Sequence, residues 1–158
     1  MSCYQCKGLT KRGTRCSLST CRWAPYCHLH TPCEVKRSPI HGRGLFARAD
    51  IPKDTIIGDY TVGTKLIPDP DAMTDEWRHN AHHLLQVGRR LYDARDWRKS
   101  IAGIANQAPR GQVNQVMFTK TGKLKTKQRV PKGRELFVSY GRSYWRTLQQ
   151  NNTSVKRQ

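Results

Sequence analysis

The residues with the clearest chemistry are six cysteines, all of which lie within the first 33 positions, where His28 and His30 also occur. Cys6 and Cys16 enclose a short loop, and Cys27 begins a second group that ends at His30. Thiolate and imidazole groups in such an arrangement are the ligands that tetrahedral zinc prefers. So few residues cannot bury a useful core, and a metal would therefore supply most of the folding free energy of this segment.

The histidines among the cysteines, together with first residues that lack the apolar core of a signal peptide, favour zinc over disulfides. The segment also resembles a small cysteine/histidine module in which a Thr-Lys-x-Gly loop separates the first two cysteines and Cys-x-x-His closes the site. That resemblance implies four zinc ligands, which are Cys6, Cys16, Cys27 and His30. The alternatives are reduced cysteines without a metal, or a ligand set that includes Cys3, Cys21, Cys33 or His28.

Length and composition limit the domain organisation. A chain of 158 residues with 36% apolar content suits one ordinary domain with an appendage and excludes two large domains. Because cysteines cease after residue 33, we expect a module at 1–33, a main domain at 34–146 and a polar, flexible tail at 147–158. No apolar run approaches the roughly 18 residues of a membrane span, so we expect a soluble intracellular protein without a membrane partner.

The charge is unevenly distributed along the chain. The net charge of +18 favours contact with a polyanion such as nucleic acid. Residues 1–49 hold nine basic and one acidic side chain and residues 97–158 hold fourteen and one, whereas residues 50–96 hold six and nine. The basic ends could therefore contact nucleosomal DNA, while the middle segment is net negative and could attract a basic peptide.

Short apolar runs between Gly-rich and Pro-rich turns predict a mostly β main domain. The expected strands lie at 45–47, 55–60, within 113–119, at 123–127 and at 135–141, with a hairpin over 84–92. Two short helices are expected, at 74–82 and 97–105.

Three motifs give residues 35–145 a resemblance to the SET domain, in the compact form used by virus-encoded lysine methyltransferases. Residues 38–47, SPIHGRGLFA, are similar to the opening Gly-x-Gly motif of that family. Residues 101–108, IAGIANQA, resemble the segment that ends in Asn-His-Ser, and residues 132–141, KGRELFVSYG, resemble the closing Gly-Glu-Glu-Leu and Tyr-Gly motif. The motifs occur in the family's order and at comparable spacing.

The resemblance implies a mostly β, SET-type fold of several small sheets with short helices, preceded by the zinc module. It also implies transfer of a methyl group from S-adenosylmethionine to a protein lysine, with Tyr140 as the catalytic residue. Cofactor-binding residues by the same resemblance are Gly42, Arg43, Gly44, Leu45, Asn106, Gln107, Tyr140, Tyr144 and Trp145. Asp59 and Tyr60 are expected to bind the substrate, although Tyr60 could equally be a core residue.

The sequence departs from the family at two places. Gln107 and Ala108 stand where the family has histidine and serine, and no cysteine-rich segment follows Tyr140. A SET fold that has lost catalysis and acts as a zinc-containing nucleic-acid-binding or adaptor protein is therefore the alternative. If the protein is an enzyme, a histone tail is the favoured substrate and a nonhistone protein is the alternative substrate. The expected location is the nucleus.

Overall fold

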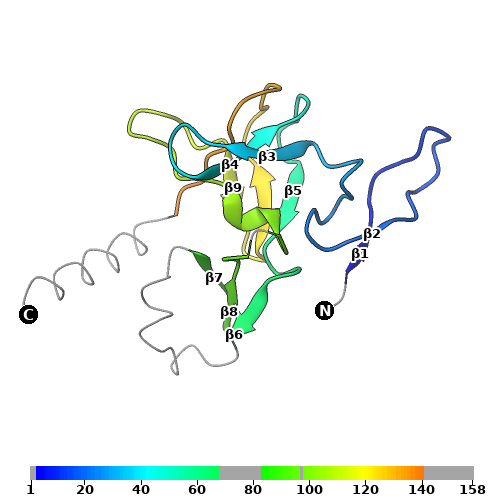
Figure 1. Ribbon diagram of the computed structural model, residues 1–158, viewed down its shortest axis with the longest axis horizontal. Helices are drawn as coiled ribbons and strands as arrows, with labels where there is room; N and C mark the ends of the chain where they lie inside the picture. Colours follow the sequence, from blue (N-terminus) through cyan, green and yellow to red (C-terminus); the bar gives the residue numbers. More distant parts are fainter. Residues whose placement is uncertain (1–2, 68–82, 97, 141–158) are drawn as a thin grey trace, which may run out of the picture.

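The computed structural model describes residues 3–67, 83–96 and 98–140, which Figure 1 shows as a body of short strands with a slender N-terminal extension. Within the described residues the strands form four small sheets, β1-β2, β3-β4, β5-β10-β9 and β6-β8-β7, with antiparallel neighbours throughout. The elements are β1 (Tyr4–Gln5), β2 (Ser19–Thr20), β3 (Cys33–Arg37), β4 (Arg43–Ala47), β5 (Ile56–Asp59), β6 (Lys65–Ile67), β7 (Leu84–Val87), β8 (Arg90–Asp93), η2 (Ile101–Ile104), β9 (Val116–Phe118) and β10 (Lys123–Thr126). The mostly β fold of several small sheets predicted from the sequence is confirmed.

The main core lies where β4, β5, β10 and the 3-10 helix η2 meet. Leu45, Ile57 and Leu124 are completely buried there, and η2 adds Ile101. Burial of each such side chain contributes about 1.5–3 kcal/mol to folding, so this cluster is the main source of stability. Ser100 starts η2, because its hydroxyl accepts a hydrogen bond from the Ala102 amide and donates one to the carbonyl of Asp59.

The N-terminal module has a small core of its own. Cys6, Cys16 and Cys27 are buried together with Tyr26 packed against them. β1 and β2 pair over only two residues each, so regular strand pairing contributes little to holding this segment together. The cysteine side chains, rather than a sheet or an apolar core, therefore organise the module.

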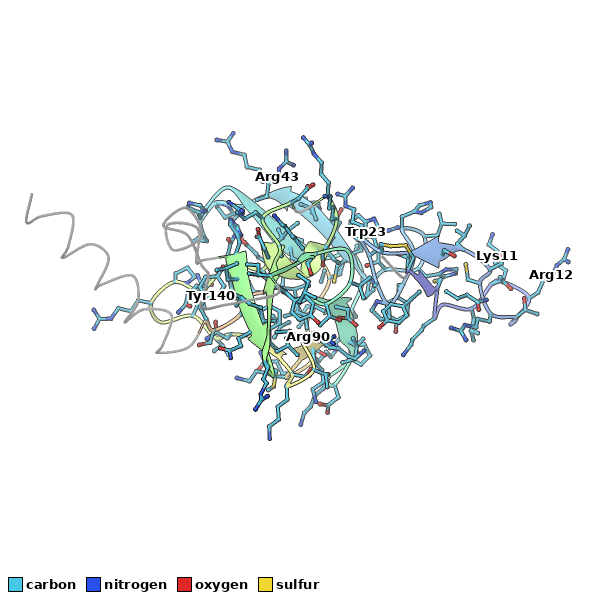
Figure 2. The ribbon with its side chains drawn as sticks, turned by 90° about the horizontal axis from the view of Figure 1, so that it is seen from below. Lys11, Arg12, Trp23, Arg43, Arg90 and Tyr140 are labelled. Carbon is cyan, nitrogen blue, oxygen red and sulfur yellow. A yellow bond between two sulfur atoms is a disulfide. The ribbon has the colours of Figure 1, made fainter. Side chains whose placement is uncertain are left out.

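The module is joined firmly to the main body. The ring of Trp23 packs against the main core, and Figure 2 shows this residue at the junction between the two parts. The Ile101 amide of η2 donates to the carbonyl of Arg22 at 3.0 Å, and the Arg48 guanidinium donates to the carbonyl of His28 at 3.0 Å. The first turn of η2 is thus held in part by the module.

Most expected strands are present, and the differences have local causes. The hairpin over 84–92 is formed by β7 and β8, whereas the helix expected at 97–105 is reduced to the four residues of η2. Residues 135–140 are extended but pair only through isolated bridges, because Val138 lies beside both Gln107 and Val116 instead of along one neighbouring strand. The helix expected at 74–82 lies outside the described residues, as do the expected tail and the last residues of the main domain.

Among the described residues, no helix has the length and apolar character that a membrane crossing requires.

Candidate active site and metal centre

The three sequence motifs converge on the side chain of Asn106. Its Nδ2 donates to the carbonyls of His41 and Arg43, at 3.2 and 3.0 Å, which belong to the first motif. Its backbone carbonyl accepts from the amide of Val138, at 2.9 Å, which belongs to the third. A single asparagine therefore holds together segments that are more than sixty residues apart in the sequence.

Glu135 completes this network from the third motif. Its Oε1 accepts from Asn106 Nδ2 at 2.9 Å and its Oε2 accepts from the Ser38 hydroxyl at 3.0 Å. The side chain is buried, so both bonds lie away from bulk water, where a bond to a charged group is strongest. Gly44 lies directly against this carboxylate, and a Cβ at that position would overlap Oε1. Glycine is required there for steric reasons, whereas Gly42 adopts a φ of +50° with open space around it.

Tyr140 lies beside the same network. Its hydroxyl donates to the carbonyl of Ala105 at 3.1 Å, and its amide donates to Oε1 of Gln107 at 3.1 Å. The ring is half-buried and packs against the main core, and Figure 2 shows Tyr140 on the side of the body away from the N-terminal module. The tyrosine is thus fixed at both its backbone and its hydroxyl, next to Asn106.

Residues 42–141 match the SET domain family, which is more than half of the chain. The chain belongs to the SET-domain family. The fold is also similar to that in the crystal structure of a candidate histone methyltransferase from Plasmodium falciparum, with a TM-score of 0.51 and 16% identity over 73% of this chain and 98% of that chain. At that identity the likeness concerns the fold. No curated protein matches the sequence.

The departure at Gln107 has a structural consequence in this SET domain. The side-chain carbonyl of Gln107 accepts the Tyr140 amide, and its backbone pairs with Val138. The glutamine that stands where the family has histidine therefore supports the position of the tyrosine backbone. Ala108 has no polar side chain with which to replace the serine.

The two residues expected to bind substrate are engaged within the protein. Asp59 is buried, and its carboxylate accepts from the amide and hydroxyl of Thr61 and pairs with Lys123 at 3.2 Å. Tyr60 is buried next to Phe118 in an edge-to-face contact, and its hydroxyl donates to the carbonyl of His83. Desolvation raises the pKa of Tyr60, with smaller contributions from Asp93 and Tyr140, so its phenol stays neutral. Their substrate-binding roles stay predictions.

The remaining cofactor-binding predictions are divided between described and undescribed parts of the chain. Leu45 is completely buried, so only its backbone could face a cofactor, and its carbonyl accepts from the Leu136 amide at 2.7 Å. Arg43 is exposed at the start of β4. Tyr144 and Trp145 lie outside the described residues.

Four side chains of the N-terminal module form a candidate metal centre. The sulfur of Cys27 lies 4.0 Å from that of Cys16 and 3.2 Å from Nδ1 of His30, and Nδ1 lies 3.5 Å from the sulfur of Cys6. All four ligand atoms lie within 4.8 Å of one another. Sulfur and nitrogen ligands around a tetrahedral zinc are separated by about 3.3–3.8 Å. The separations of 3.2, 3.5 and 4.0 Å lie within a few tenths of an ångström of that range, so this set of donor atoms fits that ion.

The surroundings act differently on two thiols of this cluster. A hydrogen bond with the Leu18 backbone lowers the pKa of the Cys16 thiol, but burial and the neighbouring Cys27 outweigh it and raise that pKa. Backbone amides of Gly8 and Cys27 donate to the sulfur of Cys6 at 3.3 and 3.1 Å. Burial raises the pKa of the Cys27 thiol, but hydrogen bonds with His30 and with nearby backbone amides outweigh it and lower the pKa to about 6. Cys27 is therefore largely a thiolate at neutral pH.

The alternative ligands lie elsewhere. Cys3 and Cys21 form a disulfide beside the β1-β2 pair, which the preference for zinc over disulfides did not foresee. Cys33 is the first residue of β3 and belongs to the main core, where burial raises the pKa of its thiol to about 12. His28 is exposed, and only its backbone carbonyl holds a neighbouring residue, Arg48. Of these residues only Cys6, Cys16, Cys27 and His30 come together.

Proposed function

We propose that this protein is an S-adenosylmethionine-dependent protein-lysine N-methyltransferase that acts on a histone or another chromatin-associated protein. The observation that carries the proposal is the position of Asn106, whose side chain bonds the Gly42 segment and whose neighbours Ala105 and Gln107 hold Tyr140. The residues that we expect to bind the cofactor and to act in catalysis are close together, which supports the proposal.

The residues present fit the cofactor. The turn that contains Gly42 is exposed, has open space where a side chain would project, and lies against the half-buried Asn106. A polar ligand could therefore lie along this backbone without displacing a side chain. When bound, S-adenosylmethionine would supply an electrophilic methyl group on a sulfonium.

Tyr140 would orient the amine that receives the methyl group. Its hydroxyl donates its hydrogen to the carbonyl of Ala105, and a phenol oxygen can also accept an N–H, which would here come from the incoming lysine. The lysine must lose its proton before it can react, and apolar surroundings of the amine favour its neutral form. The chemistry thus needs orientation and desolvation rather than a strong base.

The substrate class follows from charge. By sequence the middle of the chain is net negative, which favours a basic tail, and the basic ends would tolerate nearby DNA, so the sequence favours chromatin and hence the nucleus. The acidic side chains of residues 50–96 that the structure describes each pair with a lysine or arginine, so the support from charge comes from the sequence. A Zn²⁺ ion held by Cys6, Cys16, Cys27 and His30 would stabilise the N-terminal module. The sequence resembles compact, virus-encoded lysine methyltransferases. The proposal therefore includes a viral origin for this protein and the nucleus of a host cell as the place where it acts.

The test is transfer of labelled methyl from S-adenosylmethionine to core histones, nucleosomes and a total protein extract. The variant Tyr140→Phe should lose most of the transfer, while Tyr26→Phe, another half-buried tyrosine but in the N-terminal module, should keep it. Label on a lysine that depends on Tyr140 would establish the activity and name the substrate.

The second candidate is an adaptor that has kept the SET fold without catalysis. The replacement of the family's His-Ser pair by Gln107 and Ala108 favours it. Calorimetry with S-adenosylmethionine separates the two, because the enzyme must bind the cofactor. An absence of both binding and label would favour the adaptor.

A further inference from the structure

One basic surface of the described chain lies in the N-terminal module. Residues 1–33 contain no aspartate or glutamate but five basic side chains, Lys7, Lys11, Arg12, Arg15 and Arg22. Lys7, Lys11, Arg12 and Arg15 are exposed, and these four make no ion pair with a carboxylate among the described residues. Their charge is therefore directed at solvent and at any partner that approaches.

Residues 8–16 form a hairpin that presents two of these charges at its tip, and we call it the basic hairpin. Leu9 pairs with Arg15 at its base, and the Thr10 amide donates to the carbonyl of Thr14 at 2.8 Å. The Thr10 and Thr14 hydroxyls also bond each other at 2.8 Å. Gly13 supplies the turn, with a φ of +76° and nothing near it.

The hairpin is held at its base as well as at its tip. The Arg15 guanidinium donates to the carbonyls of Gln5 and Cys6, at 3.3 and 3.2 Å. Cys16, the last residue of the hairpin, and Cys6, which precedes it, both belong to the candidate metal centre. A charged loop held in this way loses less conformational entropy on binding than a free tail would.

The location of the hairpin separates it from the candidate active site. In Figure 2, Lys11 and Arg12 project from one end of the molecule, and Tyr140 lies near the other end of the described chain. A polyanion on the hairpin would therefore leave the site around Tyr140 accessible to a peptide.

We propose that the basic hairpin docks the phosphate backbone of duplex DNA, with Lys11 and Arg12 each neutralising a phosphate. Single-stranded nucleic acid is usually bound by stacking on aromatic side chains, and residues 7–19 contain none. The side chains offered here are cationic or carry hydroxyls, which suit phosphate contacts that position a protein without reading sequence. The choice of DNA as the duplex rests on the proposed function at chromatin.

The experiment measures binding of a fluorescent 30-base-pair DNA duplex to the full chain by anisotropy over a salt series, without cofactor. The variant Lys11→Gln/Arg12→Gln should bind several-fold more weakly, and its slope of log affinity against log salt should fall by about two, since each lost phosphate contact removes about 0.9. The matched control is Lys127→Gln/Lys132→Gln, which removes the same charge from exposed positions of the main domain and should change both quantities much less.

Three results would overturn the inference. The control pair could weaken binding as much as the hairpin pair, which would mean that the total charge of +18 binds DNA diffusely. The salt slope of the hairpin variant could remain that of the natural protein, or a single strand of equal length could bind more tightly than the duplex. A thermal melt and a zinc assay of each variant would establish that its module is folded.

The outcome can be separated from that of the proposed function. Methyl transfer to a free peptide should be unchanged in the hairpin variant, because Lys11 and Arg12 lie away from Tyr140. DNA binding that depends on the hairpin, without methyl transfer, would support the docking surface and contradict the proposed methyltransferase activity. Methyl transfer to a free peptide, together with DNA binding that does not depend on the hairpin, would support the methyltransferase activity and contradict the docking surface.

Discussion

Asn106 and Glu135 are joined by a hydrogen bond of 2.9 Å between the side-chain amide and a buried carboxylate oxygen. The same carboxylate accepts the hydroxyl of Ser38, so one side chain connects the opening, middle and closing motifs of the SET domain. Glu135 is therefore expected to position the turn around Gly42 through Asn106, without contact with the reacting atoms.

Replacement of Glu135 by alanine should loosen this turn and destabilise the domain. Each hydrogen bond to a charged group contributes about 1.5–3 kcal/mol, so Glu135→Ala should lower the free energy of unfolding by about 3 kcal/mol. Affinity for S-adenosylmethionine should fall roughly tenfold or more, since about 1.4 kcal/mol corresponds to that factor. Denaturant unfolding and calorimetry measure the two effects. Glu135→Gln keeps an oxygen for Asn106 and should restore most of both, whereas loss of stability with unchanged affinity would reduce Glu135 to a structural residue.

Gly42 and Gly44 should respond differently to the same substitution. Gly44→Ala places a Cβ against Glu135 and should cost about 2–3 kcal/mol through displacement of the carboxylate. Gly42→Ala meets no atom within 4 Å, so its cost should be the roughly 1–2 kcal/mol of a left-handed residue, with cofactor binding reduced further.

Gly13→Ala is the matched control, because Gly13 also has a positive φ and open surroundings but lies in the basic hairpin. It should share the modest stability cost of Gly42→Ala and leave cofactor affinity intact. Equal cofactor affinity in Gly42→Ala and Gly13→Ala would argue against a cofactor on the Gly42 turn.

The local parts of the fold could be predicted from sequence because they depend on nearest neighbours. The hairpin of β7 and β8 follows from an apolar alternation interrupted by Gly88, and the three motifs follow from resemblance. The partners of Glu135 could not be predicted, since nothing in a lone strand glutamate indicates Ser38, which is 97 residues away. The same holds for Asp59 and Lys123, where an acidic side chain expected to face substrate is neutralised by a distant strand.

The cysteines also differ in how far their roles could be predicted from the sequence. Spacing and family likeness indicated the four residues that the structure gathers, but the pairing of Cys3 with Cys21 depends on the β1-β2 register and had no sequence signal of its own. Cys33 resembles the other cysteines in the sequence, yet strand β3 carries it into the main core.

The metal centre leads to a prediction about zinc content. The natural protein should contain one zinc ion at the four-ligand cluster, and Cys16→Ser should lose it and unfold the module, because structural zinc supplies about 10–16 kcal/mol. Elemental analysis of the purified protein measures the zinc. Cys33→Ala removes another buried thiol without touching the cluster, so it should retain the ion. A natural protein without zinc, or a Cys16→Ser variant that keeps it, would exclude the assignment.

The contact between the module and η2 leads to the last prediction. Trp23→Ala removes a half-buried ring from the main core and should lower the free energy of unfolding by about 2 kcal/mol, below the 3–5 kcal/mol of a fully buried tryptophan. The Ile101 amide should exchange its hydrogen faster, because its acceptor is the carbonyl of the preceding residue, Arg22.

Hydrogen exchange at Ile101 distinguishes a docked module from an independent one. Leu29→Ala, at a mostly exposed apolar position of the same module, should leave that exchange rate unchanged. Removal of zinc should accelerate it as Trp23→Ala does, because Arg22 is held by the module that the metal folds. Since η2 leads directly into Asn106, faster exchange at Ile101 should be accompanied by weaker binding of S-adenosylmethionine. Unchanged exchange after zinc removal would mean that the main domain holds η2 without help from the module.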